Sequence, residues 1–375
     1  MKIYGTRWEN LDARLAEIEG GIDLDTYLSP SNRKAEFNTW LTAYNNGESY
    51  NPVFEFDPLP DVREDDLWTF LKSLEKSDPL ESVYSDAARL RLGEIEMCKI
   101  RRGDIISHRS TAIYGKPGET LLKQARQNLA ELPENDPILD GETINAEEAA
   151  EICRKAMTDY GFSWKVVVKK EMGAKALVDN LIKEFWIRDD VVWSMGVMKM
   201  IVVHEIGTHI FRTENGYAQP LGIFGRGLPA YQLTEEGLAE YTELETGCLH
   251  NDTIRRISAR VIGVDVALRG SFSDVVEAVK GYQEPDMLFD IAQRAKLGQA
   301  DTSQPGSYTK DYCYLEGFYR MKEWFEASPS QEDLDSLFAG KVGFQHLNLV
   351  KELQKDGYLH KPKQLPDWLG ETSAE

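Results

Sequence analysis

The sequence predicts a mainly helical α+β fold with a helical N-terminal lobe and a small, mostly antiparallel sheet beside one histidine-bearing helix. Three observations predict this fold. Helix-periodic segments alternate with Pro- and Gly-rich turns over the first 140 residues. A stretch rich in Val, Trp and Phe at 164–190 has strand character, and the next helical segment carries His-Glu-x-x-x-His at 204–209. We expect residues 1–140 to form the lobe and residues 141–375 the domain with this motif, either as two domains or as one compact unit.

Five segments of the N-terminal lobe have the apolar spacing of amphipathic helices. They are WENLDARLAEIE, SNRKAEFNTWLTAY, REDDLWTFLKSLEK, ESVYSDAARLRLGEIEMCKIRRG and GETLLKQARQNLAEL. Proline and glycine separate them, as in YNPVFEFDPLPDV. The sequence of this lobe contains no evident catalytic cluster, and we expect its lone histidine, His108, to be a core or surface residue.

The second part of the chain begins with a predicted helix, and sequence signals indicate both of its ends. Asn145 followed by Glu148 is a capping-box variant, and Gly161 can end the helix AEEAAEICRKAMTDYG. WKVVVKKEM then has strand character, and KALVDNLIKEFWIRDD can supply one or two further strands. KEFWIRDD could offer an edge to which an extended peptide adds by backbone pairing. Ser194 can cap the next helix, SMGVMKMIVVHEIGTHIFRTENG, which Asn215–Gly216 would end.

A loop rich in Gly and Pro, YAQPLGIFGRGLPAYQL, leads from the histidine helix to a second helix, TEEGLAEYTELETG. We expect Thr234 to begin this helix and Gly247 to end it. Further helices are expected in SFSDVVEAVKGY, in DYCYLEGFYRMKEWFE and around LVKELQKDG.

Composition restricts the class of protein. The chain has 375 residues and a net charge of −20, which argues against nucleic acid and anionic membranes as partners. No stretch approaches the roughly 20 apolar residues of a membrane span, and MKIYGTRWENLDARL reaches charged residues too early for a secretory signal. The four cysteines form no CxxC pair, which favours reduced structural thiols. We therefore expect a cytoplasmic protein.

The HEIGTH segment has the chemistry of a catalytic zinc site. Such a site needs about three protein ligands, an open position and a nearby carboxylate that takes a proton from water. In the HExxH arrangement the histidines are four residues apart and share one helical face. Here His204 and His209 are five apart, which on an ideal α-helix turns the second by about 140° from the first. A π-bulge would bring them together, and Gly207 would tolerate it, so we predict a widened turn at Ile206–Thr208.

The third ligand is expected from the TEEGLAEY helix, whose two glutamates lie 26 and 27 positions beyond His209. In gluzincin peptidases the ligand is a glutamate followed by Gly, an apolar residue and Ala, a small-residue pattern that lets this helix approach the first. Glu236 begins the sequence EGLA, which has this form. We therefore expect one zinc ion on His204, His209 and Glu236, with Glu205 as the general base. Glu235 would orient a ligating histidine or cap the helix.

Four segments together resemble a known family. HEIGTHIFRTENGYAQPL, RGLPAYQLTEEGLAEY, SYTKDYCYLEGFY and GKVGFQHLNLV are similar to the DUF1704 family of QEGLA-motif proteins, which includes the microtubule-associated tyrosine carboxypeptidases. The similarity covers about Asn145 to Val350. It implies a zincin fold of the gluzincin kind and a zinc metallocarboxypeptidase that removes a C-terminal residue from a peptide or protein, tyrosine in the eukaryotic tubulin-acting members.

Carried onto this chain, the resemblance implies the same four residues, with His204, His209 and Glu236 as ligands and Glu205 as the base. One departure is Glu235, which stands where the family usually has Gln. We expect a prokaryotic-type member, because the chain lacks the long basic or disordered extension of a microtubule binder. Tubulin is therefore not inferred as its substrate.

A carboxypeptidase must also bind the terminal carboxylate of its substrate, for which arginine or lysine is suited. The candidates are Arg212 near the end of the histidine helix, Arg226 in the Gly-rich loop and Lys310 in TKDYCY. Tyr231 and Tyr314 could donate a hydrogen bond to the oxyanion, although each of the five residues is more often structural. Three alternatives stay open: an aminopeptidase with an acidic site for the amine, an endopeptidase with a cleft open at both ends, and a regulatory protein with a vestigial zinc site.

Overall fold

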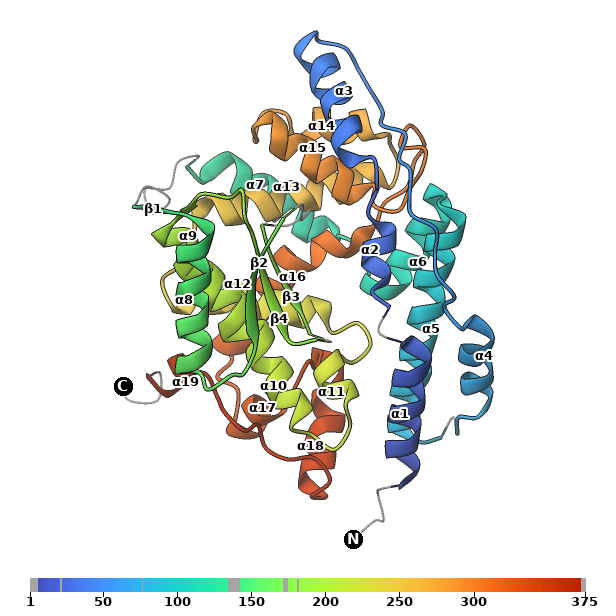
Figure 1. Ribbon diagram of the computed structural model, residues 1–375, viewed down its shortest axis with the longest axis vertical. Helices are drawn as coiled ribbons and strands as arrows, with labels where there is room; N and C mark the ends of the chain where they lie inside the picture. The colour runs from blue at the N-terminus through green and yellow to red at the C-terminus, as the bar shows by residue number, and fades with distance from the viewer. Residues whose placement is uncertain are drawn as a thin grey trace. The chain divides into compact units, whose positions relative to one another are not determined.

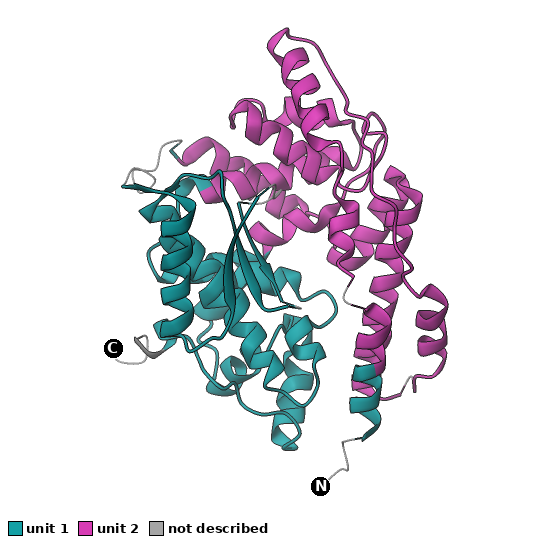
Figure 2. Cartoon of the chain, in the orientation of Figure 1, with its two compact units in different colours: residues 1–13, 133–252, 317–375 teal, residues 14–132, 253–316 magenta. Residues whose placement is uncertain are grey.

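The computed structural model describes residues 6–20, 22–75, 77–133, 142–170, 175–180 and 182–371. It is mainly helical, as Figure 1 shows, and it has two small sheets. The chain groups into two compact units, coloured in Figure 2: unit 1 comprises Met1–Ala13, Pro133–Asp252 and Gly317–Glu375, and unit 2 comprises Arg14–Leu132 and Thr253–Glu316. The expected domain boundary at residue 140 stays a prediction.

Unit 2 is built from helices, and all five segments predicted in the N-terminal lobe are helical. The bounds are α1 (Thr6–Glu19), which begins in unit 1, α2 (Leu24–Leu28), α3 (Arg33–Asn45), α4 (Glu64–Lys72), α5 (Pro79–Ile100), α6 (Gly103–Tyr114), α7 (Glu119–Glu131), α13 (Asn251–Ala267), α14 (Phe272–Val279), α15 (Pro285–Ala295) and the 3-10 turn Thr309–Asp311. The short helix α2 and the longer α6, α13 and α15 were not predicted.

Unit 1 holds both sheets and the histidine helix. Its elements are β1 (Thr143–Ile144), α8 (Ala146–Asp159), β2 (Lys165–Lys169), β3 (Ala176–Asp179), β4 (Glu184–Arg188), β5 (Trp193–Ser194), α9 (Met195–Ile201), the π-helix η2 (Val202–Ile210), α10 (Phe211–Tyr217), α11 (Ile223–Arg226), α12 (Gln232–Glu245), most of α16 (Tyr312–Glu326), α17 (Gln331–Leu337), η4 (Phe344–His346), α18 (Leu347–Lys355) and α19 (Trp368–Glu371). In the described part of the chain, no helix is both long and apolar enough to cross a membrane.

The two sheets differ from the single, mostly antiparallel sheet that was expected. The three-stranded sheet has the order β2-β4-β3, in which β4 runs parallel to β2 and antiparallel to β3. β1 and β5 form a separate antiparallel pair. Because β4 is paired on both sides, the expectation that KEFWIRDD offers a free edge to a peptide is wrong.

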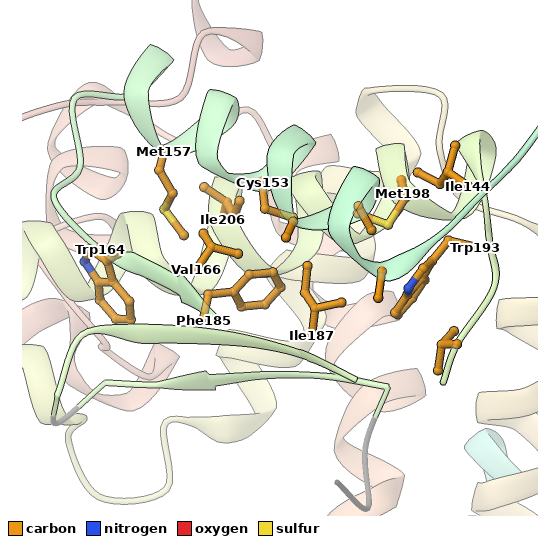
Figure 3. Packing of buried hydrophobic residues seen from close by; sticks show 14 of the residues in the cluster. Ile144, Cys153, Met157, Trp164, Val166, Phe185, Ile187, Trp193, Met198 and Ile206 are labelled. Carbon is orange, nitrogen blue, oxygen red and sulfur yellow. The ribbon is translucent and has the colours of Figure 1, made fainter. Parts of the chain in front are cut away.

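A hydrophobic core joins this sheet to the helices that carry the motif. The side chains of β4 alternate, so that Phe185 and Ile187 are buried. Figure 3 shows them against Cys153 and Met157 of α8, and Ile206 of η2 belongs to the same buried cluster. The sheet and α8 therefore support η2 from one side.

Most of the predicted helix ends in unit 1 are confirmed. Asn145 and Glu148 form the capping box of α8, Gly161 follows that helix with φ +73°, and the Ser194 hydroxyl accepts a hydrogen bond from Val197 N. The histidine helix continues to Tyr217, slightly past the expected end.

The predicted start of the second site helix is wrong. The helix α12 begins at Gln232, earlier than expected, with Tyr231 as its N-cap residue. Thr234 does not cap it, because its hydroxyl accepts a hydrogen bond from Phe344 N instead. The expected end is confirmed: α12 ends at Glu245, shortly before Gly247 with φ +65°.

Candidate metal centre

The widened turn predicted between the two histidines is present and longer than expected. η2 is a nine-residue π-helix between α9 and α10, and it contains all of Ile206–Thr208. Its i to i+5 repeat places residues five apart on one face. The rings of His204 and His209 accordingly lie with their centroids 4.8 Å apart. A Cβ at Gly207 would lie 3.3 Å from the Tyr160 hydroxyl, so little space remains for a side chain at this turn.

The helix α12 packs against η2 and brings its glutamates to the histidines. We expected the small residue Gly237 to let α12 approach η2, but its close contact is with another helix. A Cβ at Gly237 would lie 2.2 Å from the carbonyl carbon of Gly317, so this glycine permits close approach of the α16 backbone rather than of η2. The position of Glu236 thus depends on how the neighbouring Gly237 packs against α16.

Three ligand atoms converge where the sequence predicts a metal. Glu236 Oε2 lies 3.9 Å from His204 Nε2 and 3.6 Å from His209 Nε2, and the candidate ligand atoms of the three residues lie within 4.8 Å of one another. Their side chains are 15%, 12% and 13% exposed, in the order His204, His209, Glu236. Two histidines and one carboxylate form a donor set typical of catalytic zinc, so the residues present fit this ion.

The other ring nitrogen of each histidine is held by a carboxylate. His204 Nδ1 lies 2.8 Å from Glu243 Oε1, and His209 Nδ1 lies 2.9 Å from Glu235 Oε1. These contacts orient both rings and direct each Nε2 toward Glu236. The predicted orienting role of Glu235 thus has a matching contact. Glu243 was missed, although its spacing of seven residues from Glu236 places both on one face of α12.

The site carries an excess of negative charge. Burial lowers the pKa of His204, but its hydrogen bond to Glu243 and the nearby charge of Glu205 outweigh burial and raise that pKa to about 10. Burial also lowers the pKa of His209, yet Glu235 and Glu236 raise it to about 9. This surplus of carboxylates favours a cation between the two rings.

Glu235 has two cationic neighbours. Arg212 is fully buried, forms an ion pair with Glu235, and donates to Leu337 O at 3.0 Å and Val342 O at 2.7 Å. Lys341 Nζ lies 3.5 Å from Glu235 Oε1. Burial raises the pKa of Glu235, but these two cations reverse the effect and hold it well below its usual range. Arg212, a candidate for binding substrate, is directed inward toward Glu235.

The remaining substrate-binding candidates are distributed over both units. In unit 1, Arg226 pairs with Asp12 at 3.0 Å, and Lys341 Nζ lies 5.6 Å from the centroid of the Tyr231 ring. In unit 2, Lys310 Nζ lies 3.1 Å from Asp25 Oδ2, and the guanidinium of Arg260 lies 5.4 Å from the centroid of the Tyr314 ring. Their roles in substrate binding stay predictions.

Lys341 was given no role in the sequence analysis, although it belongs to the GKVGFQHLNLV segment that carries part of the family resemblance. Its side chain is only 4% exposed. Burial lowers the pKa of Lys341, but Tyr231 and Glu235 outweigh it and raise that pKa above its ordinary value. Only the folded chain places this lysine beside Glu235, because the two residues are far apart in sequence.

The chain is similar in sequence to known proteins. A family model described as "Microtubule-associated tyrosine carboxypeptidase" matches residues 44–375. The putative tyrosine carboxypeptidase MATCAP2 of Mus musculus is 31% identical over 182 residues, covering 47% of this chain and 33% of the relative. The microtubule-associated tyrosine carboxypeptidase 1 of Rattus norvegicus is 33% identical over 182 residues, covering 46% and 35%. The protein of that name from Homo sapiens is 34% identical over 140 residues, covering 34% and 27%. The matches span about a third of the length of these relatives.

Proposed function

The chain belongs to the microtubule-associated tyrosine carboxypeptidase family, and from this membership we propose that it is a zinc-dependent carboxypeptidase with a zincin-like catalytic unit. The observation that supports this proposal best is the convergence of His204 Nε2, His209 Nε2 and Glu236 Oε2. Both Nδ1 atoms are already held by carboxylates, so the arrangement leaves the Nε2 atoms for a metal ion. The reaction is hydrolysis of the last peptide bond of a peptide or protein.

Each residue of the site has a distinct part in the proposed reaction. His204, His209 and Glu236 would hold zinc, which supplies Lewis acidity that makes a water molecule more acidic and polarises the peptide carbonyl. Glu205, partly exposed beside His204, would take the proton of the attacking water and pass it to the leaving amine. Glu235 and Glu243 keep the rings in place during this proton transfer.

The substrate class is the C-terminus of a peptide or protein. The names of the relatives specify tyrosine carboxypeptidases, and we extend this to the present chain as a preference for tyrosine or another aromatic C-terminal residue. Tubulin is not proposed as its substrate.

The test is hydrolysis of a peptide library with defined C-terminal residues by the zinc-loaded protein, followed by mass spectrometry. We expect the wild type to release single C-terminal residues, with aromatic ones preferred. Glu205→Gln should retain about one zinc per chain and lose roughly 100-fold or more of the rate, because it cannot accept a proton. Cleavage at internal or N-terminal bonds would contradict the carboxypeptidase assignment, and equal activity of Glu205→Gln would contradict the role of Glu205.

A further inference from the structure

We propose that Lys341 binds the terminal carboxylate of the substrate, an inference that rests on the proposed carboxypeptidase function. The ammonium lies beside Glu235 and the ring of Tyr231, at the start of the helix that also carries Glu236. Lysine binds a carboxylate through charge and up to three N–H donors.

The backbone around Lys341 is held in place on both sides. Lys341 N donates to Phe224 O at 2.7 Å, and Lys341 O accepts from Leu228 N at 3.0 Å. Three residues later, Phe344 N donates to the hydroxyl of Thr234 in the first turn of α12 at 2.9 Å. The lysine is thus attached to the same turn that presents Glu235 and Glu236, which fixes the origin of its side chain relative to the metal ligands.

The contacts of this ammonium differ from those of a second buried lysine, Lys296. Lys296 Nζ contacts three carbonyl oxygens, Ala267 O at 3.3 Å, Gly270 O at 2.6 Å and Gln304 O at 2.8 Å. Lys341 Nζ has an ion pair with Glu235 at 3.5 Å and lies 5.6 Å from the centroid of the Tyr231 ring. An ammonium carries three N–H donors, so these contacts leave donors for a ligand that brings its own oxygens.

Lys341 shares its partner Glu235 with Arg212. Arg212 already forms an ion pair with Glu235 Oε2, and its other contacts are the carbonyls of Leu337 and Val342. Glu235 therefore faces two buried cations, of which Arg212 also donates to two carbonyls, whereas Lys341 Nζ lies 3.5 Å from Glu235 Oε1. A substrate carboxylate would give Lys341 an anionic partner that it does not share with Arg212.

The test compares a peptide that ends in a free carboxylate with the same peptide ending in an amide. Binding of both is measured by calorimetry to zinc-loaded Glu205→Gln, with and without Lys341→Met. We expect Glu205→Gln to prefer the acid, and Lys341→Met to weaken acid binding by about 30-fold or more while leaving amide binding nearly unchanged. Lys341→Arg should restore part of the preference, and Lys155→Met, which removes an exposed lysine of α8, should leave it intact.

The ratio of acid to amide affinity separates substrate binding from a structural role. If Lys341 only stabilises Glu235, Lys341→Met weakens both peptides alike, the ratio stays unchanged and the proposal is overturned. Lys341→Gln, which removes the charge but keeps an N–H donor toward Glu235, gives the same test should Lys341→Met fold poorly. Absence of C-terminal cleavage by the wild type would overturn the carboxypeptidase assignment as well, whereas cleavage with an unchanged ratio would overturn only the assignment of Lys341.

Discussion

At the scale of single residues, the two ring-orienting carboxylates differ in their surroundings. Glu235 has Arg212 and Lys341 beside it, and these cations offset part of the negative charge that acts on His209. Within the described part of the chain, Glu243 Oε2 is buried without a hydrogen-bond partner, while Oε1 contacts His204. The same chemical group therefore acts on the two histidines with unequal strength, because a cation beside a carboxylate reduces its pull on a proton.

This difference predicts separate outcomes for two conservative substitutions. Glu243→Gln and Glu235→Gln should each lower zinc affinity by about 10- to 100-fold, because each weakens the group that orients a ligating ring. Only Glu235→Gln should also destabilise the metal-free protein strongly, by about 3–5 kcal/mol, because it leaves buried cations without a counter-charge. Zinc affinity is measured by competition with a chelator and stability by denaturant unfolding.

Glu151→Gln, an exposed carboxylate of α8, serves as the control for these two variants. Zinc affinity at the wild-type level in Glu243→Gln would show that the contact between Glu243 and His204 does not orient the ring.

At the scale of elements, the sequence analysis was most successful where a local pattern was strong. The capping box at Asn145 and the cap at Ser194 depend on neighbouring residues alone, and both are present. The π-helix could be predicted because five-residue spacing of two ligands requires it. Gly237 shows the limit: its small size is evident from the sequence, but the partner that needs it, Gly317, is found only in the packed structure.

The close contact between α12 and α16 predicts the effect of one methyl group. Gly237→Ala places a Cβ against the Gly317 backbone, which cannot move as a side-chain end can, so α12 must shift and carry Glu236 with it. We expect a loss of about 1–3 kcal/mol in unfolding free energy together with weaker zinc binding. Gly281→Ala, where no atom lies within 4 Å of the added Cβ, is the matched control. Wild-type zinc affinity in Gly237→Ala would mean that the ligand position does not depend on this contact.

The turn η4 contains a buried histidine that predicts a pH dependence of stability. Burial lowers the pKa of His346 from 6.5 to about 4. Because the folded protein holds this imidazole neutral, its contribution is fully present above pH 6.5 and is lost as pH falls through 4. Unfolding free energies of the wild type and His346→Asn, measured from pH 7 to pH 4, should converge by up to about 3 kcal/mol as the wild type loses this contribution.

Asparagine can retain the hydrogen bond that Gly343 N donates to His346 Nδ1, which makes His346→Asn a conservative test. A constant difference between the two proteins over this pH range would show that burial does not depress the pKa of His346.

At the scale of the whole molecule, more of the candidate site than of the surrounding fold could be predicted from the sequence. His204, His209 and Glu236 follow from spacing and residue type, and the structure brings them together. Lys341 could not be predicted, because its relation to Glu235 depends on how distant segments pack. The same reason explains why the segment Thr253–Glu316 groups with the N-terminal helices, which no local pattern indicates.

The division into units predicts where zinc binding stabilises the chain. The three candidate ligands all belong to unit 1, so zinc at 100 times its dissociation constant should add about 2.7 kcal/mol to the stability of the elements that hold them. Hydrogen exchange with zinc and with a chelator should show new protection in η2 and α12, and little change in α14 of unit 2. Glu236→Gln should abolish the zinc-dependent protection while exchange in α14 stays as in the wild type. Equal protection of α14 by zinc would contradict this prediction, because it would mean that the two units unfold as one cooperative structure.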